Sequence, residues 1–144
     1  MTKAHKNIII GRQAEQASLE NIIESPEAEF LAIYGRRRIG KTFLITEYFK
    51  HKTVFFELTG EKKAKAPRQR EHFAKAFRKA FPKVYLQQTP SSWEDAFATL
   101  EEALTHLPNS RKNKKITIFI DELPWLASPR SNFIESLEYF WNTY

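Results

Sequence analysis

One eight-residue stretch constrains this chain more than any other part of the sequence. It runs from Gly35 to Thr42 and reads Gly, four other residues, Gly-Lys-Thr, which is the pattern of a loop that binds phosphate groups. The apolar residues 30–34 precede the loop, and residues 43–49 can begin a helix. Strand, glycine loop and helix, in this order, form the context in which the pattern makes a binding site.

The four residues that define the pattern each have a physical role. Gly35 can leave the strand through backbone angles closed to other residues, and Gly40 lets the chain pass close to a phosphate. Backbone amides of the loop and of the first helical turn converge on one place, where the helix dipole also favours an anion. Lys41 supplies charge for the β- and γ-phosphates, and Thr42 offers a hydroxyl to Mg²⁺. The alternative is a chance match on a tight turn, which the complete pattern and its context disfavour.

An acidic pair provides a second polar signal, far downstream of the loop. Residues 116–120 are a strand-like apolar run, and Asp121 and Glu122 follow it directly. Ligands of open α/β sheets bind at the carboxyl ends of the strands. Asp121 is therefore expected to hold Mg²⁺, directly or through water, opposite Thr42. Glu122 is expected to polarise the water that attacks the γ-phosphate. The alternative is a solvent-exposed acidic pair, which the upstream loop makes less favourable.

Strand patterns alternate with helical patterns along the chain, and this alternation predicts an α/β fold with a parallel sheet. The predicted strands are residues 30–34, 53–58 and 116–121. The last of them is expected to be buried and to end at Asp121. The predicted helices are residues 14–25, 43–52, 67–81, 91–107 and a final one that starts at Ser131 or Asn132.

Aromatic residues recur at helical spacing in the predicted helices and mark the sides that face the core. Ser91 and Glu94 read as a capping box at the start of helix 91–107. The residues expected on core-facing sides are Phe73, Phe77 and Phe81, then Trp93, Phe97, Leu100, Leu104 and Leu107, and finally Phe133, Leu137, Phe140, Trp141 and Tyr144.

Composition excludes several classes of protein. The 144 residues include no cysteine, which excludes disulfides and thiolate metal sites and agrees with a cytoplasmic location. No apolar run approaches the roughly 20 residues of a membrane span, so no membrane association is expected. The start of the chain lacks the apolar core of a signal peptide. At this length, one domain with a sizeable core is expected.

The net charge is +6, and the basic residues gather in three clusters, residues 62–65, 68–83 and 111–115. One interpretation is contact with nucleic acid. The other is solvated loops and helix faces, and it is favoured because few aromatic residues interleave with the clusters.

Motifs along nearly the whole chain resemble those of the archaeal and prokaryotic ATPase family, a branch of the AAA+-like and STAND P-loop ATPases. The Gly-Arg-Arg-Arg form of the glycine loop is particular to that family. The segments that carry the resemblance are Gly11-Arg12 with Glu15, Tyr34–Thr42, Phe119–Ala127, Pro129–Phe133 and Leu137–Trp141.

The resemblance implies a P-loop NTPase three-layer sandwich that binds ATP and Mg²⁺, with adenine preferred over guanine. Gly11 and Arg12 match the segment that packs near the adenine, and Gly60 matches a family position to which we assign no physical role. Glu122 and Lys41 are the expected catalytic residues, and Thr42 and Asp121 the expected metal ligands. The expected nucleotide-binding residues are Gly11, Arg12, Gly35, Arg36, Arg37, Arg38, Ile39, Gly40, Lys41, Thr42 and Phe43.

The sequence stops at Tyr144, before two further strands that such domains have. Residues 1–144 are therefore expected to be the N-terminal portion of an ATPase domain, with no second domain. No residue is identified as a sensor or an arginine finger. ATP hydrolysis is the expected function of the complete domain. The alternatives are a nucleotide-binding switch without turnover and a DNA-associated module. Either alternative is compatible with a homo-oligomer or with binding to a partner protein.

Overall fold

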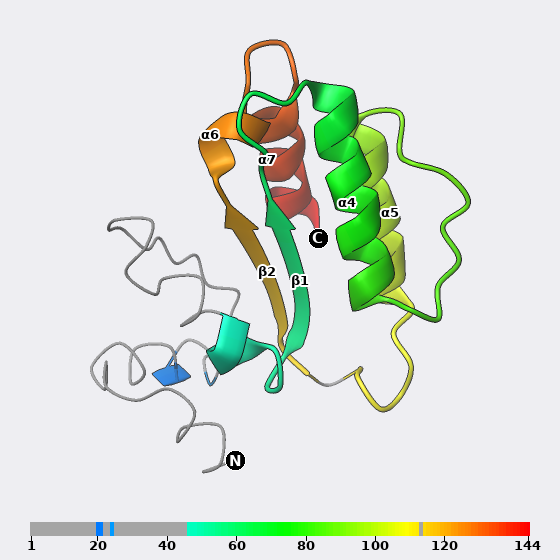
Figure 1. Ribbon diagram of the computed structural model, residues 1–144. Helices are drawn as coiled ribbons and strands as arrows, with labels where there is room; N and C mark the ends of the chain where they lie inside the picture. Colours follow the sequence, from blue (N-terminus) through cyan, green and yellow to red (C-terminus); the bar gives the residue numbers. More distant parts are fainter. Residues whose placement is uncertain (1–19, 22–23, 25–45, 113) are drawn as a thin grey trace. The chain divides into compact units, whose positions relative to one another are not determined.

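The computed structural model describes residues 20–21, 24, 46–112 and 114–144 (Figure 1). The predicted strand 30–34, the glycine loop, most of the predicted helix 14–25 and the first three residues of the predicted helix 43–52 lie outside the described residues. Residues 46–49 are helical, and residues 50–52 form a turn. The elements that follow are β1 (Val54–Thr59), α4 (Ala66–Ala80), α5 (Trp93–Thr105), β2 (Ile116–Asp121), α6 (Leu123–Leu126) and α7 (Phe133–Thr143).

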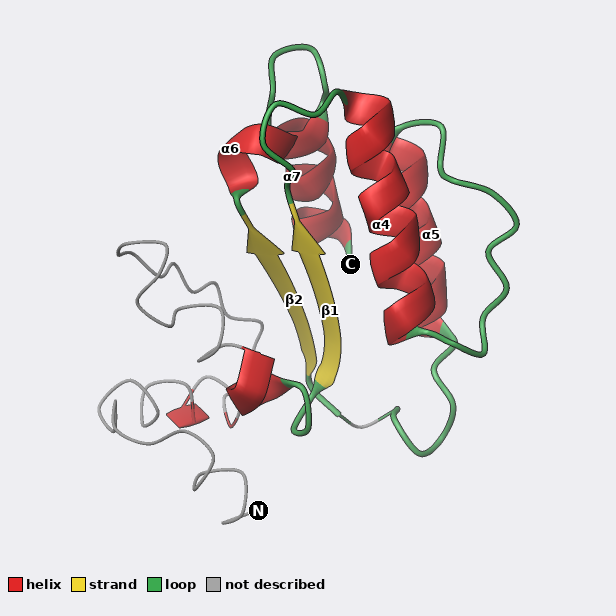
Figure 2. Ribbon diagram, viewed as in Figure 1, coloured by secondary structure: helices red, strands yellow, loops and turns green. Residues whose placement is uncertain are grey.

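The strands β1 and β2 pair as a two-stranded parallel sheet. The Val54 amide donates to the Lys115 carbonyl at 2.9 Å at one end, and the Gly60 amide donates to the Asp121 carbonyl at 2.9 Å at the other. Both arrowheads in Figure 2 therefore lie at one edge. Because parallel strands require a long crossover, the helices α4 and α5 lie between them in sequence. The predicted α/β class and parallel pairing are confirmed.

The chain divides into two compact units, each of which contains part of both strands. One comprises residues 1–55 and 114–117, and the other comprises residues 56–113 and 118–144. In the first unit, the buried Tyr48 hydroxyl donates to Glu20 Oε1 at 3.1 Å. Burial and the adjacent Glu20 carboxylate raise the pKa of Tyr48 above that of an ordinary phenol.

An aromatic cluster forms the core of the second unit. The Phe73 ring from α4 lies 5.3 Å from the Phe56 ring of β1 and 6.1 Å from the Trp93 ring of α5, measured between centroids. The Trp93 ring in turn lies 4.8 Å from the Phe133 ring of α7 in an edge-on pair. Each such pair contributes about 0.5–1.5 kcal/mol beyond the area it buries. The predicted core-facing sides of α4 and α5 are confirmed, because Phe77, Phe81, Phe97, Leu100 and Leu104 are buried as well.

The start of α5 differs from the prediction by one residue. Ser92 is the N-cap, and its hydroxyl accepts the Asp95 amide at 3.0 Å. The Asp95 carboxylate accepts the Ser91 amide at 3.2 Å. The predicted pair Ser91 and Glu94 was therefore wrong. The Asp95 carboxylate thus bonds the amide of the residue before the cap, and not the Ser92 amide as in a capping box. Trp93 is already helical and buried, so the extended residue before it makes the cap.

Three other expectations about the second half of the chain were wrong in part. Trp141 is 49% exposed, since it lies about 100° around α7 from the buried Phe140 and cannot share its face. Tyr144, also predicted to face the core, is 52% exposed, although its ring stacks on that of Phe140. The side chains of β2 before Asp121 are half-buried, where a buried strand was predicted. The short helix α6 lies where no helix was predicted, and Pro124 in its first turn is compatible with a helix start. Within the described residues, no helix is long and apolar enough to cross a membrane.

Candidate functional site

Asp121 and Glu122 lie where β2 ends, at the edge that carries the carboxyl ends of both strands (Figure 2). Asp121 is the last residue of β2 and is only 9% exposed. Its Oδ1 accepts the Glu122 amide at 2.9 Å, which holds the Asp121 carboxylate against the turn that follows. A buried carboxylate keeps its charge only where hydrogen bonds or cations compensate it, so this position suits an acid that binds a cation.

Glu122 turns the chain from β2 into α6 through an unusual backbone conformation. Its φ of 58° and ψ of 41° lie in the left-handed region, which costs a non-glycine residue about 1–2 kcal/mol. Such strain persists when the surrounding structure over-determines it, and it clusters at functional sites. The Glu122 carbonyl accepts the Trp125 amide at 3.1 Å, which fixes the turn from its far side.

Gly60 holds the same turn from the neighbouring strand, and this contact gives the residue the role that sequence reasoning missed. Its amide donates to the Asp121 carbonyl at 2.9 Å. A Cβ atom at Gly60 would lie 2.6 Å from the Glu122 carbonyl oxygen and 3.2 Å from Trp125 Cβ. Only glycine therefore allows the end of β1 to approach the acidic turn this closely.

Replacing Gly60 with alanine is expected to destabilise the fold by about 1–3 kcal/mol, because the new methyl group forces the backbone of Glu122 to shift. Urea unfolding measures this loss. Thr59→Ala is the matched control, since the Thr59 side chain is exposed and lies one residue earlier. Equal stability of Gly60→Ala and wild type would show that the close approach of Gly60 to Glu122 is not required.

The buried side chain of Gln69 ties α4 to both neighbouring segments. It is 1% exposed, and its Oε1 accepts the Glu61 amide at 2.9 Å. Its Nε2 donates to the carbonyls of Glu61 at 2.9 Å, Ala64 at 3.2 Å and Trp125 at 3.1 Å. The Trp125 contact reaches α6, directly after the acidic turn. One amide therefore joins the loop after β1 to the helix that follows Glu122.

A sequence signal for Gln69 existed. Counting back by four from Phe81, Phe77 and Phe73 reaches Gln69, so a polar residue continues the apolar side of α4. A polar residue on a buried face has to satisfy its hydrogen bonds inside the protein. The pattern could have identified Gln69 as a buried amide, although not its partners.

An exposed ion-pair group lies beside this loop. The Glu61 carboxylate contacts Nε2 of His72 and, at 3.1 Å, Nε of Arg68. Hydrogen bonds from His72 and then from Arg68 lower the pKa of Glu61. Because all of these side chains reach solvent, the group contributes little to stability.

Glu57 on β1 is a third carboxylate near the acidic turn. Its burial raises the pKa of Glu57 above the ordinary 4.5, and the negative charge of Asp121 raises it further, while Lys79 acts in the opposite sense. The folded state therefore binds the Glu57 proton more tightly than the unfolded chain does. Stability from this group is fully present below pH 4.5 and is lost as the pH rises through the higher pKa of the folded state.

Replacing Glu57 with glutamine is accordingly expected to raise the melting temperature at pH 7 and to leave it unchanged near pH 4. The variant has no carboxylate at position 57, so no charge has to form there in the folded protein. Thermal unfolding across this pH range measures the effect, with Glu138→Gln on the exposed side of α7 as the control. A melting-temperature difference that is the same at both pH values would contradict the linkage to Glu57.

The residues at the carboxyl edge of the sheet are of a type that can bind Mg²⁺. Mg²⁺ commonly binds one or two carboxylates and completes its shell with water and phosphate oxygens. The Asp121 carboxylate supplies one such ligand. Among the described side chains, no group of three or more His, Cys, Asp or Glu is arranged to hold a metal by itself. An ion at Asp121 would therefore depend on other ligands for most of its shell.

The remaining predicted site residues, Gly11, Arg12, residues 35–42 and Phe43, lie outside the described residues.

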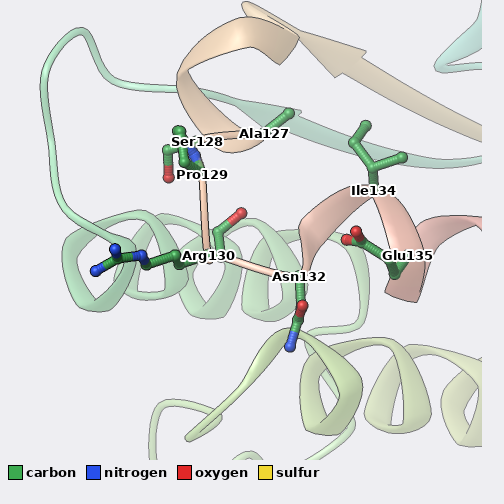
Figure 3. A pocket seen from close by; sticks show the side chains of 8 residues that line it. Ala127, Ser128, Pro129, Arg130, Asn132, Ile134 and Glu135 are labelled. Carbon is green, nitrogen blue, oxygen red and sulfur yellow. The ribbon is translucent and has the colours of Figure 1, made fainter.

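A small hollow of about 180 Å³ lies in the connection between α6 and α7 (Figure 3). Two residues with positive φ, Arg130 and Asn132, shape its rim. Ser131 Oγ accepts the Phe133 amide at 3.2 Å and donates to the Leu126 carbonyl at 3.2 Å, which joins the two helices. None of the predicted site residues lines the hollow, and the Arg130 guanidinium lies apart from the Glu135 carboxylate. We therefore assign no chemistry to it.

Comparison with known proteins identifies the family. A family model for an ATPase domain predominantly from Archaea matches residues 9–143. An uncharacterized protein of Methanocaldococcus jannaschii is 27% identical over 127 residues, which are 88% of this chain and 24% of that relative. The chain thus spans about a quarter of the length of this relative. No solved structure matches the chain significantly. Because the family model covers almost every residue, the chain belongs to the family of ATPase domains found predominantly in Archaea.

Proposed function

We propose that this chain binds ATP through residues 35–42 and hydrolyses it in a Mg²⁺-dependent reaction. The observation that supports this most strongly is the position of Asp121 and Glu122 at the carboxyl end of a parallel strand, in a chain of an ATPase family that also carries the glycine loop. We further propose that the fold is the three-layer sandwich of the AAA+-like and STAND branch.

The proposed roles follow from the chemistry of each side chain. Lys41 and the amides of the glycine loop bind the β- and γ-phosphates. Thr42 and Asp121 would hold Mg²⁺, which supplies positive charge against the phosphates when it is bound. Gly11 and Arg12 would lie near the adenine. We propose that Arg36, Arg37 and Arg38 extend the phosphate contacts or reach a neighbouring subunit.

Glu122 is the proposed general base. A water oxygen attacks the γ-phosphorus, the bond between this phosphorus and the bridging oxygen breaks, and ADP leaves with the electron pair. The proton of the attacking water passes to the Glu122 carboxylate, and inorganic phosphate is the second product. The left-handed turn at Glu122 fixes where this side chain leaves the backbone. The contacts from Gly60 and Trp125 hold that turn before substrate arrives.

Release of phosphate from ATP tests the proposal. Wild-type protein is expected to release phosphate with Mg²⁺ present and to lose this activity when EDTA removes the ion. Saturable ATP binding without phosphate release would support the switch without turnover instead. Absence of both would overturn the proposal.

A further inference from the structure

Positive charge is concentrated in one segment of the chain. Residues 61–83 contain nine Lys or Arg and two Glu, a net charge of +7, whereas the whole chain carries +6. The lysines of this segment are all exposed, and they lie on the outer side of α4 and on the loops at its two ends. Such a concentration costs folding energy through self-repulsion, and it creates a positive potential that attracts anionic partners.

Three basic residues in and after the second half of α4 lack an ion-pair partner among the described side chains, whereas Lys79 in the same half interacts with the Glu57 carboxylate. Lys75 and Arg78 are one helical turn apart, and Lys83 follows the end of the helix. Among the described side chains, no carboxylate lies within ion-pair distance of these residues. The first half differs, because Arg68 there pairs with Glu61 at 3.1 Å and with Glu71 at 3.6 Å.

An exposed aromatic side chain adjoins these charges. Tyr85, in the connection between α4 and α5, is 86% exposed. It lines a hollow of about 400 Å³ together with Arg78, Pro82, Lys83, Val84 and Leu86. In Figure 1 this connection bends away from both helices. The Arg78 guanidinium donates to the Leu86 carbonyl at 3.2 Å, so it also braces the loop that carries Tyr85.

Helix electrostatics accounts for part of this arrangement only. Arg78 and Lys79 lie in the last turn of α4, where the helix dipole favours cations. It does not account for Lys83, which lies beyond the helix, or for a tyrosine that leaves most of its ring in water. Cations that bind phosphates beside aromatic rings that stack on bases are the features of single-strand binding surfaces.

We propose that this surface, formed by Lys75, Arg78, Lys83 and Tyr85, binds single-stranded nucleic acid. The cations contact the phosphate backbone, and the Tyr85 ring stacks on a base. The proposal is independent of ATP hydrolysis, because it uses none of the residues placed in the nucleotide site.

Fluorescence anisotropy with a labelled oligothymidine tests the proposal. Wild type is expected to bind, with the logarithm of affinity falling linearly as the logarithm of salt concentration rises. Tyr85→Ala should weaken binding by about 5- to 150-fold, and Tyr85→Phe should restore it because the ring remains. Tyr139→Ala is the matched control, since Tyr139 on α7 is also exposed. Lys41→Ala, which alters the glycine loop, should leave oligothymidine affinity unchanged.

The cationic part has its own variants. Lys75→Gln combined with Lys83→Gln should reduce the steepness of the salt dependence by about 1.4, the value for two lost phosphate contacts on a single strand. Lys50→Gln combined with Arg130→Gln removes the same charge elsewhere on the surface and should not change it. Equal binding by polyglutamate, or an affinity that Tyr85→Ala does not alter, would overturn the proposal in favour of a general anion surface. Tighter binding of duplex than of single-stranded DNA would overturn it as well.

Discussion

Replacing Glu122 with glutamine is expected to lower kcat for ATP hydrolysis by about 10²- to 10⁴-fold, the usual contribution of a positioned general base. Glutamine has the same shape and can occupy the same left-handed turn, but it cannot accept the proton of the attacking water. ATP binding relies on the glycine loop and should change little. Phosphate release under saturating ATP, together with equilibrium binding of ATP, separates the two effects.

Glu138→Gln is the control for this variant. Glu138 is an exposed residue of α7, so its substitution should leave both kcat and ATP affinity unchanged. If Glu122→Gln hydrolysed ATP at the wild-type rate, another group would have to serve as the base. If it lost ATP affinity to the same degree as turnover, Glu122 would act in binding.

Replacing Gln69 with leucine is expected to destabilise the protein by about 2–4 kcal/mol. The substitution keeps an apolar side chain of similar size in α4 but leaves the Glu61 amide and the Glu61, Ala64 and Trp125 carbonyls without their partner. Each buried polar group left unsatisfied costs about 1–3 kcal/mol, and water reaching the loop recovers some of this. Urea unfolding measures the free energy of unfolding.

Turnover adds a second readout for Gln69. Because its amide holds α6 directly after Glu122, Gln69→Leu should lower kcat more than it raises KM, even under conditions where the variant is fully folded. Gln88→Leu, at an exposed position between α4 and α5, is the matched control and should change stability by less than about 0.5 kcal/mol. Wild-type stability and kcat for Gln69→Leu would show that the buried amide is dispensable.

Local periodicity explains what could be predicted of this fold. The phenylalanines of α4 recur every four residues, and the apolar run that ends at Asp121 has the length of a strand, so both elements follow from neighbouring residues alone. The errors at Ser91, at α6 and at Trp141 are displacements of one residue or one turn. They arise where tertiary packing, such as the burial of Trp93, decides which residue takes a position.

The candidate site was predictable only as a set of residue types. Pattern and context identified Asp121 and Glu122, but not the left-handed backbone of Glu122. The supporting contacts also escaped prediction, because they join segments distant in sequence. Gln69 bonds to a carbonyl 56 residues away, and Gly60 lies against Glu122 where two neighbouring strands end. Neither partner can be identified before the chain is folded.

Titration of the wild-type chain with ATP, monitored by calorimetry, tests the central claim most directly. The account predicts saturable binding of one ATP per chain, tighter with Mg²⁺ than with EDTA, and lost in Lys41→Ala because the variant lacks the charge that meets the β- and γ-phosphates. Saturable binding that Lys41→Ala leaves unchanged, or no binding by the folded wild-type protein, would contradict it.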